Sequence, residues 1–468
     1  MRAIRCSTPS LIESKEYAMN IFRHHLLSIC ALSLLCVAIP TVRPAHAEDE
    51  PAPNGKPKRS AKAAKAEVAE RLSLDAAIAK ALAQSPRLQA FRSAVSAAAG
   101  ERRQAGARQN PEVSFSKENF AAGPAYKVLS PGQDVYGISQ LVEIGGKISA
   151  RKEVADKGLE IATLDHQAAA LDLIRDVTVA YAEAVAAEQN VRLAAEQKSL
   201  SEEVFKSVST RVNAAAAPLI QKTRSDVERH AAAVALETAK REHDIALKYL
   251  AMLLGEGAGG FTLDPEAFYT IDEPEIPATE DGLKAGPDLR RQASLQDQAK
   301  ARLDLEKANA IPDPRIGAGL TRIPSANGQA LLVGVSLPIP VLNGNRGNIQ
   351  RARSDVSRAE QDSRQVELQL GSELTRASRQ QENAYLQATT LKHEILPSAQ
   401  KAFALAREGY ELGRFPYLEV LDAQRSLFDV KKQHISASKD YHIARAAVER
   451  LTAAQLPKLQ KAGESHVD

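Results

Sequence analysis

The residues that most often carry chemistry are sparse and scattered in this sequence. Seven histidines follow residue 47, no two of them four residues apart and none with a cysteine nearby: His166, His230, His243, His393, His434, His442 and His466. Zinc sites combine His, Cys and carboxylate ligands at short, regular spacings. The pattern therefore predicts solvated helix faces and no metal site.

Gly145-Gly146-Lys147 is the segment most similar to a phosphate-binding loop. It lacks the upstream glycine and the Ser or Thr after the lysine with which such a loop holds phosphate and magnesium. We interpret it as a bend between a strand and a helix. Because the sequence has no nucleophile motif or nucleotide fingerprint, it predicts no catalytic residue, no cofactor and no enzymatic activity.

The elements that would position any site occur twice. The interval from Pro86 to Pro111 equals the interval from Pro287 to Pro312, and a strand pair, a glycine-rich break and a very long helix follow each second proline. Such self-similarity indicates a duplicated unit. The predicted organisation is a signal peptide over 1–47, a flexible lead-in over 48–70, a first repeat over 71–254, a linker over 255–282 that we expect to be irregular, a second repeat over 283–454 and a tail over 455–468.

Heptad-like patterns predict long antiparallel hairpins over 148–254 and 348–454. Small and apolar residues recur there at steps of three, four and seven residues, as in coiled coils. The outgoing helices, predicted over 148–212 and 348–411, would each span roughly 96 Å at 1.5 Å per residue. Aromatic residues make up 4% of the chain, which suits Ala-rich helices packed closely.

The strand pairs, predicted over about 112–142 and 314–338, alternate so that each strand has one apolar face. The residues expected to face lipid are Val113, Phe115, Ile138, Ile316, Leu320, Val333 and Val335. Tilted strands of this length cross a bilayer, although two soluble hairpins would alternate in the same way. Four strands cannot close a barrel, so both interpretations require strands from partner subunits.

The N-terminus has the pattern of a secretory signal, with Met19 a second candidate start. Arg23-His24-His25 precedes an apolar run, and Ala45-His46-Ala47 supplies the small residues of a cleavage site after Ala47. All three cysteines precede that cut: Cys6, Cys30 and Cys36. The bulky Leu35 before Cys36 disfavours lipid attachment. The net charge of +3, from 61 basic and 58 acidic residues, indicates no nucleic-acid partner.

The ordered features resemble those of the TolC-like outer-membrane efflux proteins over nearly all of residues 72–454. The motifs that carry the resemblance are Leu72-Ser73-Leu74-Asp75-Ala76-Ala77, Asn110-Pro111, Ser336-Leu337-Pro338-Ile339-Pro340, the second tip turn, and Leu421-Asp422-Ala423-Gln424. The segment over 338–347 is most similar to the Czc-type heavy-metal (cobalt-zinc-cadmium) members.

The resemblance implies a mainly α chain with a small transmembrane β part. It implies a homotrimer in which four strands per chain form one twelve-stranded barrel in outer-membrane lipid, continued by a periplasmic α-barrel. The partners implied are a periplasmic adaptor (membrane fusion protein) and an inner-membrane RND-type pump. The expected function is an exit duct, with heavy-metal cations as the expected cargo, in the outer membrane of a Gram-negative bacterium.

The resemblance also implies that the adaptor docks on the hairpin tips: Ala215, Ala216, Pro218, Gly413, Arg414, Phe415 and Pro416. The first tip departs from the family pattern, because alanines fill 214–217 where a glycine is common. Charges that would close the periplasmic mouth are Arg407, Glu408 and Glu411. Exposed charges that contribute little are the alternative.

Two other functions remain open. A periplasmic coiled-coil adaptor or structural protein would also have long helices, but it would have one hairpin flanked by many soluble strands. Two hairpins, each after an apolar-faced strand pair, disfavour that class. A similar duct for drugs or other small molecules is the second alternative.

Overall fold

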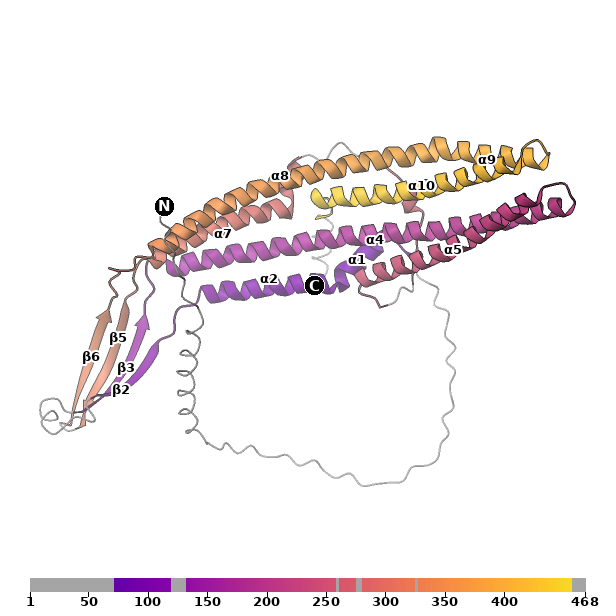
Figure 1. The fold of residues 1–468 in the computed structure, drawn as a ribbon. Coiled ribbons are helices and arrows are strands. Elements are labelled where there is room, and N and C mark those ends of the chain that lie inside the picture. The colour runs from indigo at the N-terminus through magenta and orange to yellow at the C-terminus, as the bar shows by residue number, and fades with distance from the viewer. Residues whose placement is uncertain (1–70, 119–131, 258–260, 275–279, 325–326, 457–468) are drawn as a thin grey trace, which may run out of the picture. The chain divides into compact units, whose positions relative to one another are not determined.

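The computed structural model describes residues 71–118, 132–257, 261–274, 280–324 and 327–456. These residues form long helices and one small four-stranded sheet (Figure 1). The expected signal peptide, lead-in and most of the tail lie outside the described residues. Within the described part, no helix combines the length and the apolar character needed to cross a membrane.

The sheet contains β2 (Glu112–Glu118), β3 (Gln133–Leu141), β5 (Arg315–Ile323) and β6 (Gly328–Ser336), all antiparallel and in that order. Each predicted strand pair is a hairpin, and the pairing of β3 with β5 joins the first repeat to the second. The outer strands, β2 and β6, each have only one strand neighbour among the described residues.

The first repeat contains α1 (Leu74–Gln84), α2 (Pro86–Ala105), α4 (Lys147–Asn213) and α5 (Leu219–Leu253). The 67 residues of α4 confirm the long helix that the heptad pattern predicts. Proline begins α2 because the first residue of a helix needs no backbone N–H donor. The helices α2, α5, α7 and α10 all pack along α4, which makes α4 the central element of the helical part.

The second repeat has the corresponding α7 (Pro287–Asn309), preceded by the short α6 (Glu280–Ala285), and a returning α10 (Tyr417–Leu451). The outgoing helix predicted over 348–411 changes its hydrogen-bond pattern partway along. It consists of α8 (Arg346–Thr390), a π-helical turn and α9 (Leu396–Glu411).

The π-helical turn, Leu391–Ile395, directly precedes Pro397. Proline has no N–H to donate to the preceding turn and its ring crowds the carbonyl there. A wider π turn accommodates both problems without ending the helix. The long helix predicted over 348–411 is therefore present without a non-helical residue, and what the sequence did not predict is the π-helical turn beside this proline.

The linker expected to be irregular over 255–282 is partly ordered. Within it, β4 (Thr262–Leu263) pairs in parallel with β1 (Arg71–Leu72), and a 3₁₀ turn follows over Ala267–Tyr269. The hydroxyl of Tyr181 donates to the Leu72 carbonyl at 2.9 Å and accepts from the Asp264 N–H at 3.2 Å. A buried side chain of α4 thus holds both short strands.

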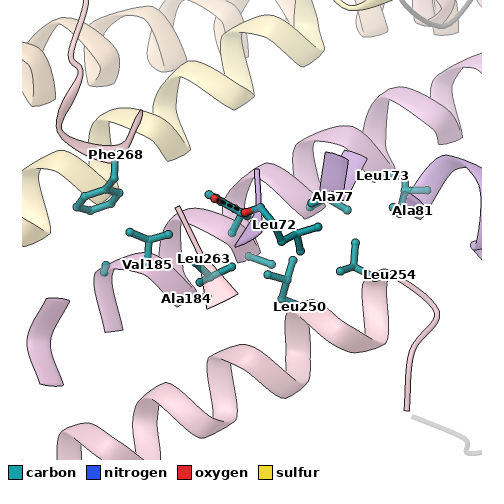
Figure 2. Close-up of a cluster of buried hydrophobic side chains, with 14 of the residues drawn as sticks. Leu72, Ala77, Ala81, Leu173, Ala184, Val185, Leu250, Leu254, Leu263 and Phe268 are labelled. Carbon is teal, nitrogen blue, oxygen red and sulfur yellow. Dashed lines mark hydrogen bonds between the residues drawn. The ribbon is translucent and has the colours of Figure 1, made fainter. Parts of the chain in front are cut away.

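A hydrophobic cluster surrounds these strands (Figure 2). Side chains from α1, α4, α5, β1, β4 and the 3₁₀ turn contribute to it. Its labelled members are Leu72, Ala77, Ala81, Leu173, Ala184, Val185, Leu250, Leu254, Leu263 and Phe268. Fully burying one leucine stabilises a fold by roughly 1.5–3 kcal/mol, so this cluster anchors the linker against the helices.

Arg450 near the end of α10 joins both repeats. It is 11% exposed, and its Nε donates to Asp172 of α4 at 2.6 Å while its Nη1 donates to Asp288 of α7 at 2.6 Å. Burial acts to lower the pKa of Arg450, but the hydrogen bonds that its guanidinium donates to Asp288 and Asp172 outweigh burial and raise the pKa above its usual value. The guanidinium therefore remains charged and holds three helices together.

We expect Arg450→Met to lower the thermal stability of the purified protein, because it leaves two carboxylates without their shared cation. Breaking a fully buried pair costs about 3–5 kcal/mol, and since these carboxylates are partly exposed we expect about 2 kcal/mol. Thermal unfolding followed by circular dichroism measures this. Arg379→Met is the matched control, since within the described residues the ion-pair partner of Arg379 is Glu382, one turn away on the exposed face of α8. Equal melting temperatures for the two variants would contradict the role of Arg450.

Candidate functional site

The two hairpin tips end their outgoing helices with the same backbone geometry. At the first tip, Ala215 has φ +57° and the Ala216 N–H donates to the Arg211 carbonyl at 2.8 Å. At the second, Gly413 has φ +72° and the Arg414 N–H donates to the Gly409 carbonyl at 2.8 Å. Both are Schellman caps, in which a left-handed residue closes the helix.

Ala215 therefore occupies the position that Gly413 occupies in the other tip. An L-residue with a Cβ in the left-handed region costs about 1–2 kcal/mol, whereas glycine adopts it readily. The first tip forms the same turn from a less favourable residue. Pro218 and Pro416 then precede the returning helices α5 and α10, as the positions of the prolines predict.

Phe415 packs against Gly409 on the outgoing helix of the second tip. A Cβ added at Gly409 would lie 2.1 Å from a carbon of the Phe415 ring, so only glycine leaves room for the ring in this position. Phe415 remains half exposed. The sequence analysis missed Gly409; the signal was a second glycine one turn before Gly413, but its contact with Phe415 is tertiary.

Arg211 connects the two tips. Its Nη1 donates to the Tyr410 carbonyl at 3.0 Å, and its guanidinium carbon lies 4.6 Å from the centre of the Tyr410 ring. Tyr410 in turn packs against Tyr417, with 5.8 Å between ring centres. Burial, helped by the nearby Glu228 carboxylate, raises the pKa of Tyr417 to about 12. The tips thus form one packed unit with a neutral aromatic interior.

Arg407, one of the proposed gate charges, bridges α9 and α4. Its guanidinium pairs with Glu203 at 2.8 Å and with Glu411 at 3.2 Å. The hydrogen bond to Glu411, and then the charge of Glu203, raise the pKa of Arg407. Glu408 makes no ion pair within the described part of the chain. All these groups are well exposed, so their pairs contribute little stability, and the gate role stays a prediction.

Two further ion pairs hold the hairpins side by side above the tips. Arg425 of α10 pairs with Glu228 of α5, and Lys431 of α10 pairs with Glu196 of α4 at 2.6 Å. Neither pair follows from sequence spacing, because the partners are far apart in the chain. Together with Arg407 they connect the second hairpin to both helices of the first.

The seven residues expected to face lipid all project from one face of the sheet. The register places Val113 opposite Ile138, Ile138 opposite Ala318, and Ala318 opposite Val333. Directly paired residues share a face, so this row is continuous across four strands. The remaining four predicted residues occupy the two adjacent rows. Phe115 and Leu320 lie in one row with Tyr136 and Leu331, and Ile316 and Val335 lie in the other.

The apolar face is solvent-exposed within one chain. Val113 is 80% exposed and Val333 is 74% exposed. The opposite face carries mostly small or polar residues, together with the larger Val135 and Leu332. The small ones are Ser114, Ser116, Gly137, Ser139, Gly317, Gly319 and Gly334. A sheet with one apolar face and one small, polar face suits a boundary between lipid and water.

The residues that suggested other chemistry serve the fold. Lys147 follows two left-handed glycines and is buried, and its ammonium lies 2.6 Å from Asp313. It therefore fixes the strand-to-helix bend instead of holding phosphate. Among the described residues, no group of three or more His, Cys, Asp or Glu side chains is placed to bind a metal ion.

His434 and His442 of α10 hold the 3₁₀ turn of the linker. The His434 ring stacks on Tyr269, and the His442 ring stacks on Phe268 with its Nε2 2.9 Å from the Phe268 carbonyl oxygen. Burial lowers the pKa of both imidazoles, which favours neutral rings at pH 7. The expected solvated histidine is wrong for these two, because the partner aromatics come from a segment distant in sequence.

Comparison with known proteins agrees with this architecture. The family model described as "Outer membrane efflux protein" matches residues 77–256 and 280–454. The cobalt-zinc-cadmium resistance protein CzcC of Cupriavidus metallidurans is 28% identical over 314 residues, which are 66% of this chain and 74% of the relative. The nickel and cobalt resistance protein CnrC of the same organism is 28% identical over 60% of this chain and 66% of the relative.

Among solved structures, the outer membrane protein VceC from Vibrio cholerae has a TM-score of 0.68 and 19% sequence identity, covering 81% of this chain and 95% of that chain. This similarity concerns the fold. Because the family model matches both repeats, from α1 to the end of α10, the chain belongs to the outer membrane efflux protein family.

Proposed function

We propose that this protein is the exit duct of a tripartite efflux system and that it carries heavy-metal cations. The observation that supports this most directly is the pairing of an exposed apolar sheet face with long hairpins that end in packed tips. The sheet supplies a surface for outer-membrane lipid. The hairpins extend from it toward partners in the periplasm.

The proposed assembly is a homotrimer. One chain contributes four strands, and its outer strands β2 and β6 have one free edge each within the described residues. A membrane-inserted sheet needs partners for every backbone N–H and C=O group. Three chains would close a barrel of twelve strands, and their hairpins would continue it as a helical tunnel.

The proposed partners are a periplasmic adaptor at the tips and an inner-membrane RND-type pump that supplies the energy. Metal cations are the preferred cargo because two relatives, CzcC and CnrC, are named for resistance to cobalt, zinc, cadmium and nickel. A duct for drugs, with the same fold, is the competing function.

A strain that lacks this gene, but retains its adaptor and pump, tests the cargo. We expect the loss of tolerance to zinc, cobalt, cadmium or nickel, and its recovery when the gene is returned on a plasmid. Growth at graded concentrations of each metal measures the effect, with a panel of unrelated antibiotics as the comparison. Restored antibiotic tolerance with unchanged metal tolerance would favour the drug duct.

The sheet orientation is tested by arginine at neighbouring positions of β2. Val113 belongs to the middle of the three apolar rows, so Val113→Arg would place a charge near the bilayer midplane at a cost of about 2–4 kcal/mol. We expect less folded protein in the outer-membrane fraction. Ser114→Arg, one residue away on the opposite face, is the matched control. Equal amounts of both variants would show that the faces are assigned incorrectly.

The second tip is tested by Gly413→Val. A β-branched residue in the left-handed region costs at least the 1–2 kcal/mol typical of any L-residue there, and this strain is confined to the tip. We expect a normal amount of outer-membrane trimer, weaker cross-linking to the adaptor and reduced efflux.

Gly409→Ala is a second variant at this tip. Its backbone is helical and adds no φ strain, but its methyl group displaces the Phe415 ring. Both variants are expected to weaken adaptor cross-linking, whereas Gly371→Ala on α8, where a Cβ meets open space, should not. Full cross-linking in both tip variants would mean that the adaptor docks elsewhere.

A further inference from the structure

Charged residues on the apolar face of the sheet gather at one end. The register places them side by side in a single charged row, which consists of Lys117, Asp134, Arg322 and Gln329. This row lies at the end of the sheet where β2 and β5 end and β3 and β6 begin, away from the strand ends that lead to the helices. Within the four described strands, no other charged residue lies on this face.

The charged row has one net positive charge. The Lys117 ammonium lies 3.4 Å from a carboxylate oxygen of Asp134, and the Lys117 side chain remains 58% exposed. Arg322 is exposed and lies on the other side of Asp134 in the register. The described residues supply Arg322 with no ion pair or hydrogen bond of its own. A guanidinium in this state can form two parallel hydrogen bonds to a phosphate group.

The opposite boundary of the apolar face carries no charge. The row there consists of Gln140, Ile316 and Val335. On the other face of the sheet, Arg315 is paired with Glu112 at 2.7 Å. The cation that lacks a partner is therefore confined to one boundary of the surface that the proposed function places in lipid.

The height of the charged row suits the headgroup region of a bilayer. Lys117 lies four residues beyond Val113 of the middle row, which is about 13 Å along the strand and about 10 Å along the membrane normal for a tilt of about 40°. The apolar band of a transmembrane barrel is about 25 Å tall, so the charged row lies near its edge. Phe115 and Tyr136 form the row just below, with 5.1 Å between ring centres, and long basic side chains extend from such a position toward the headgroups.

We propose that the charged row binds the phosphate of an anionic lipid in the outer leaflet. This inference rests on the proposed function, because it requires the apolar face to lie in lipid. Arg322 donates hydrogen bonds to the phosphate, Lys117 supplies a second positive charge, and the acyl chains cover the apolar rows below. A zwitterionic lipid is bound less tightly, because its own ammonium group neutralises its phosphate.

Tryptophan fluorescence tests this in the full-length protein, because the sequence contains no tryptophan. Phe115→Trp places a fluorophore beside the charged row, and Val335→Trp places one at the uncharged boundary. Each protein is reconstituted in phosphatidylcholine vesicles that contain increasing fractions of brominated phosphatidylglycerol or brominated phosphatidylcholine. Bromine quenches tryptophan on contact, so the two curves give the relative binding constant of the anionic lipid at each position.

We expect phosphatidylglycerol to bind beside Phe115→Trp about five times as tightly as phosphatidylcholine, as one net charge near a lipid surface provides. Beside Val335→Trp we expect no preference. In the Phe115→Trp protein, Arg322→Gln should abolish the preference and Asp134→Asn should increase it, because the net charge of the row falls or rises. Arg315→Gln removes the same charge from the other face and should leave the preference unchanged.

Three outcomes would overturn the lipid site while leaving the apolar face in lipid. They are equal quenching by the two lipids beside Phe115→Trp, a preference that survives Arg322→Gln, and the same preference at both tryptophans. If neither brominated lipid quenches either tryptophan, the lipid-facing sheet of the proposed function is itself overturned. Circular dichroism of each variant checks that the helical content is that of the parent chain.

Discussion

Every backbone donor and acceptor in a strand needs a partner, and among the described residues no further strand meets this requirement at either edge of the sheet. The strands pair in the order β2, β3, β5, β6, so the backbone groups of the two inner strands have partners on both sides. The outer strands β2 and β6 expose a row of N–H and C=O groups beside an apolar face. Water could hydrogen-bond to the edge backbone groups, and lipid could cover the apolar face. Neither solvent alone does both. The proposed assembly with further copies would resolve the conflict, because strands of neighbouring copies would pair with the edges while lipid covers the apolar face.

Duplication explains how a chain with few bulky side chains reaches such an assembly. The contact between β3 and β5 joins the two repeats within one chain. The contact proposed between chains would use the same kind of antiparallel strand pairing. In the helical part, Arg450 plays the same joining role by pairing with Asp172 and Asp288. At the tips, Arg211 joins the first repeat to the second, because its guanidinium donates to the Tyr410 carbonyl and lies over the Tyr410 ring.

Sequence periodicity predicts those parts of the structure that repeat regularly. Alternation identified the strands and their apolar face, and heptads with Gly and Pro turns identified the hairpins. The ordered linker was missed because two-residue strands have no period and depend on Tyr181 for their position. The contact of Phe415 with Gly409 and the bridges of Arg450 were missed because their geometry is tertiary. The π-helical turn that precedes Pro397 was missed although the proline itself is visible in the sequence.

The fate of the chemically versatile residues fits passive transport. His434 and His442 are buried against aromatic rings, with pKa values lowered by that burial, and Lys147 is paired with Asp313 at a bend. Groups that are used in packing in this way are not available to bind or transform a cargo. The proposed exit duct needs no such group, because in that proposal the free energy for export enters at the pump. In the same proposal, the surfaces that matter for function are the apolar sheet face, the sheet edges and the hairpin tips.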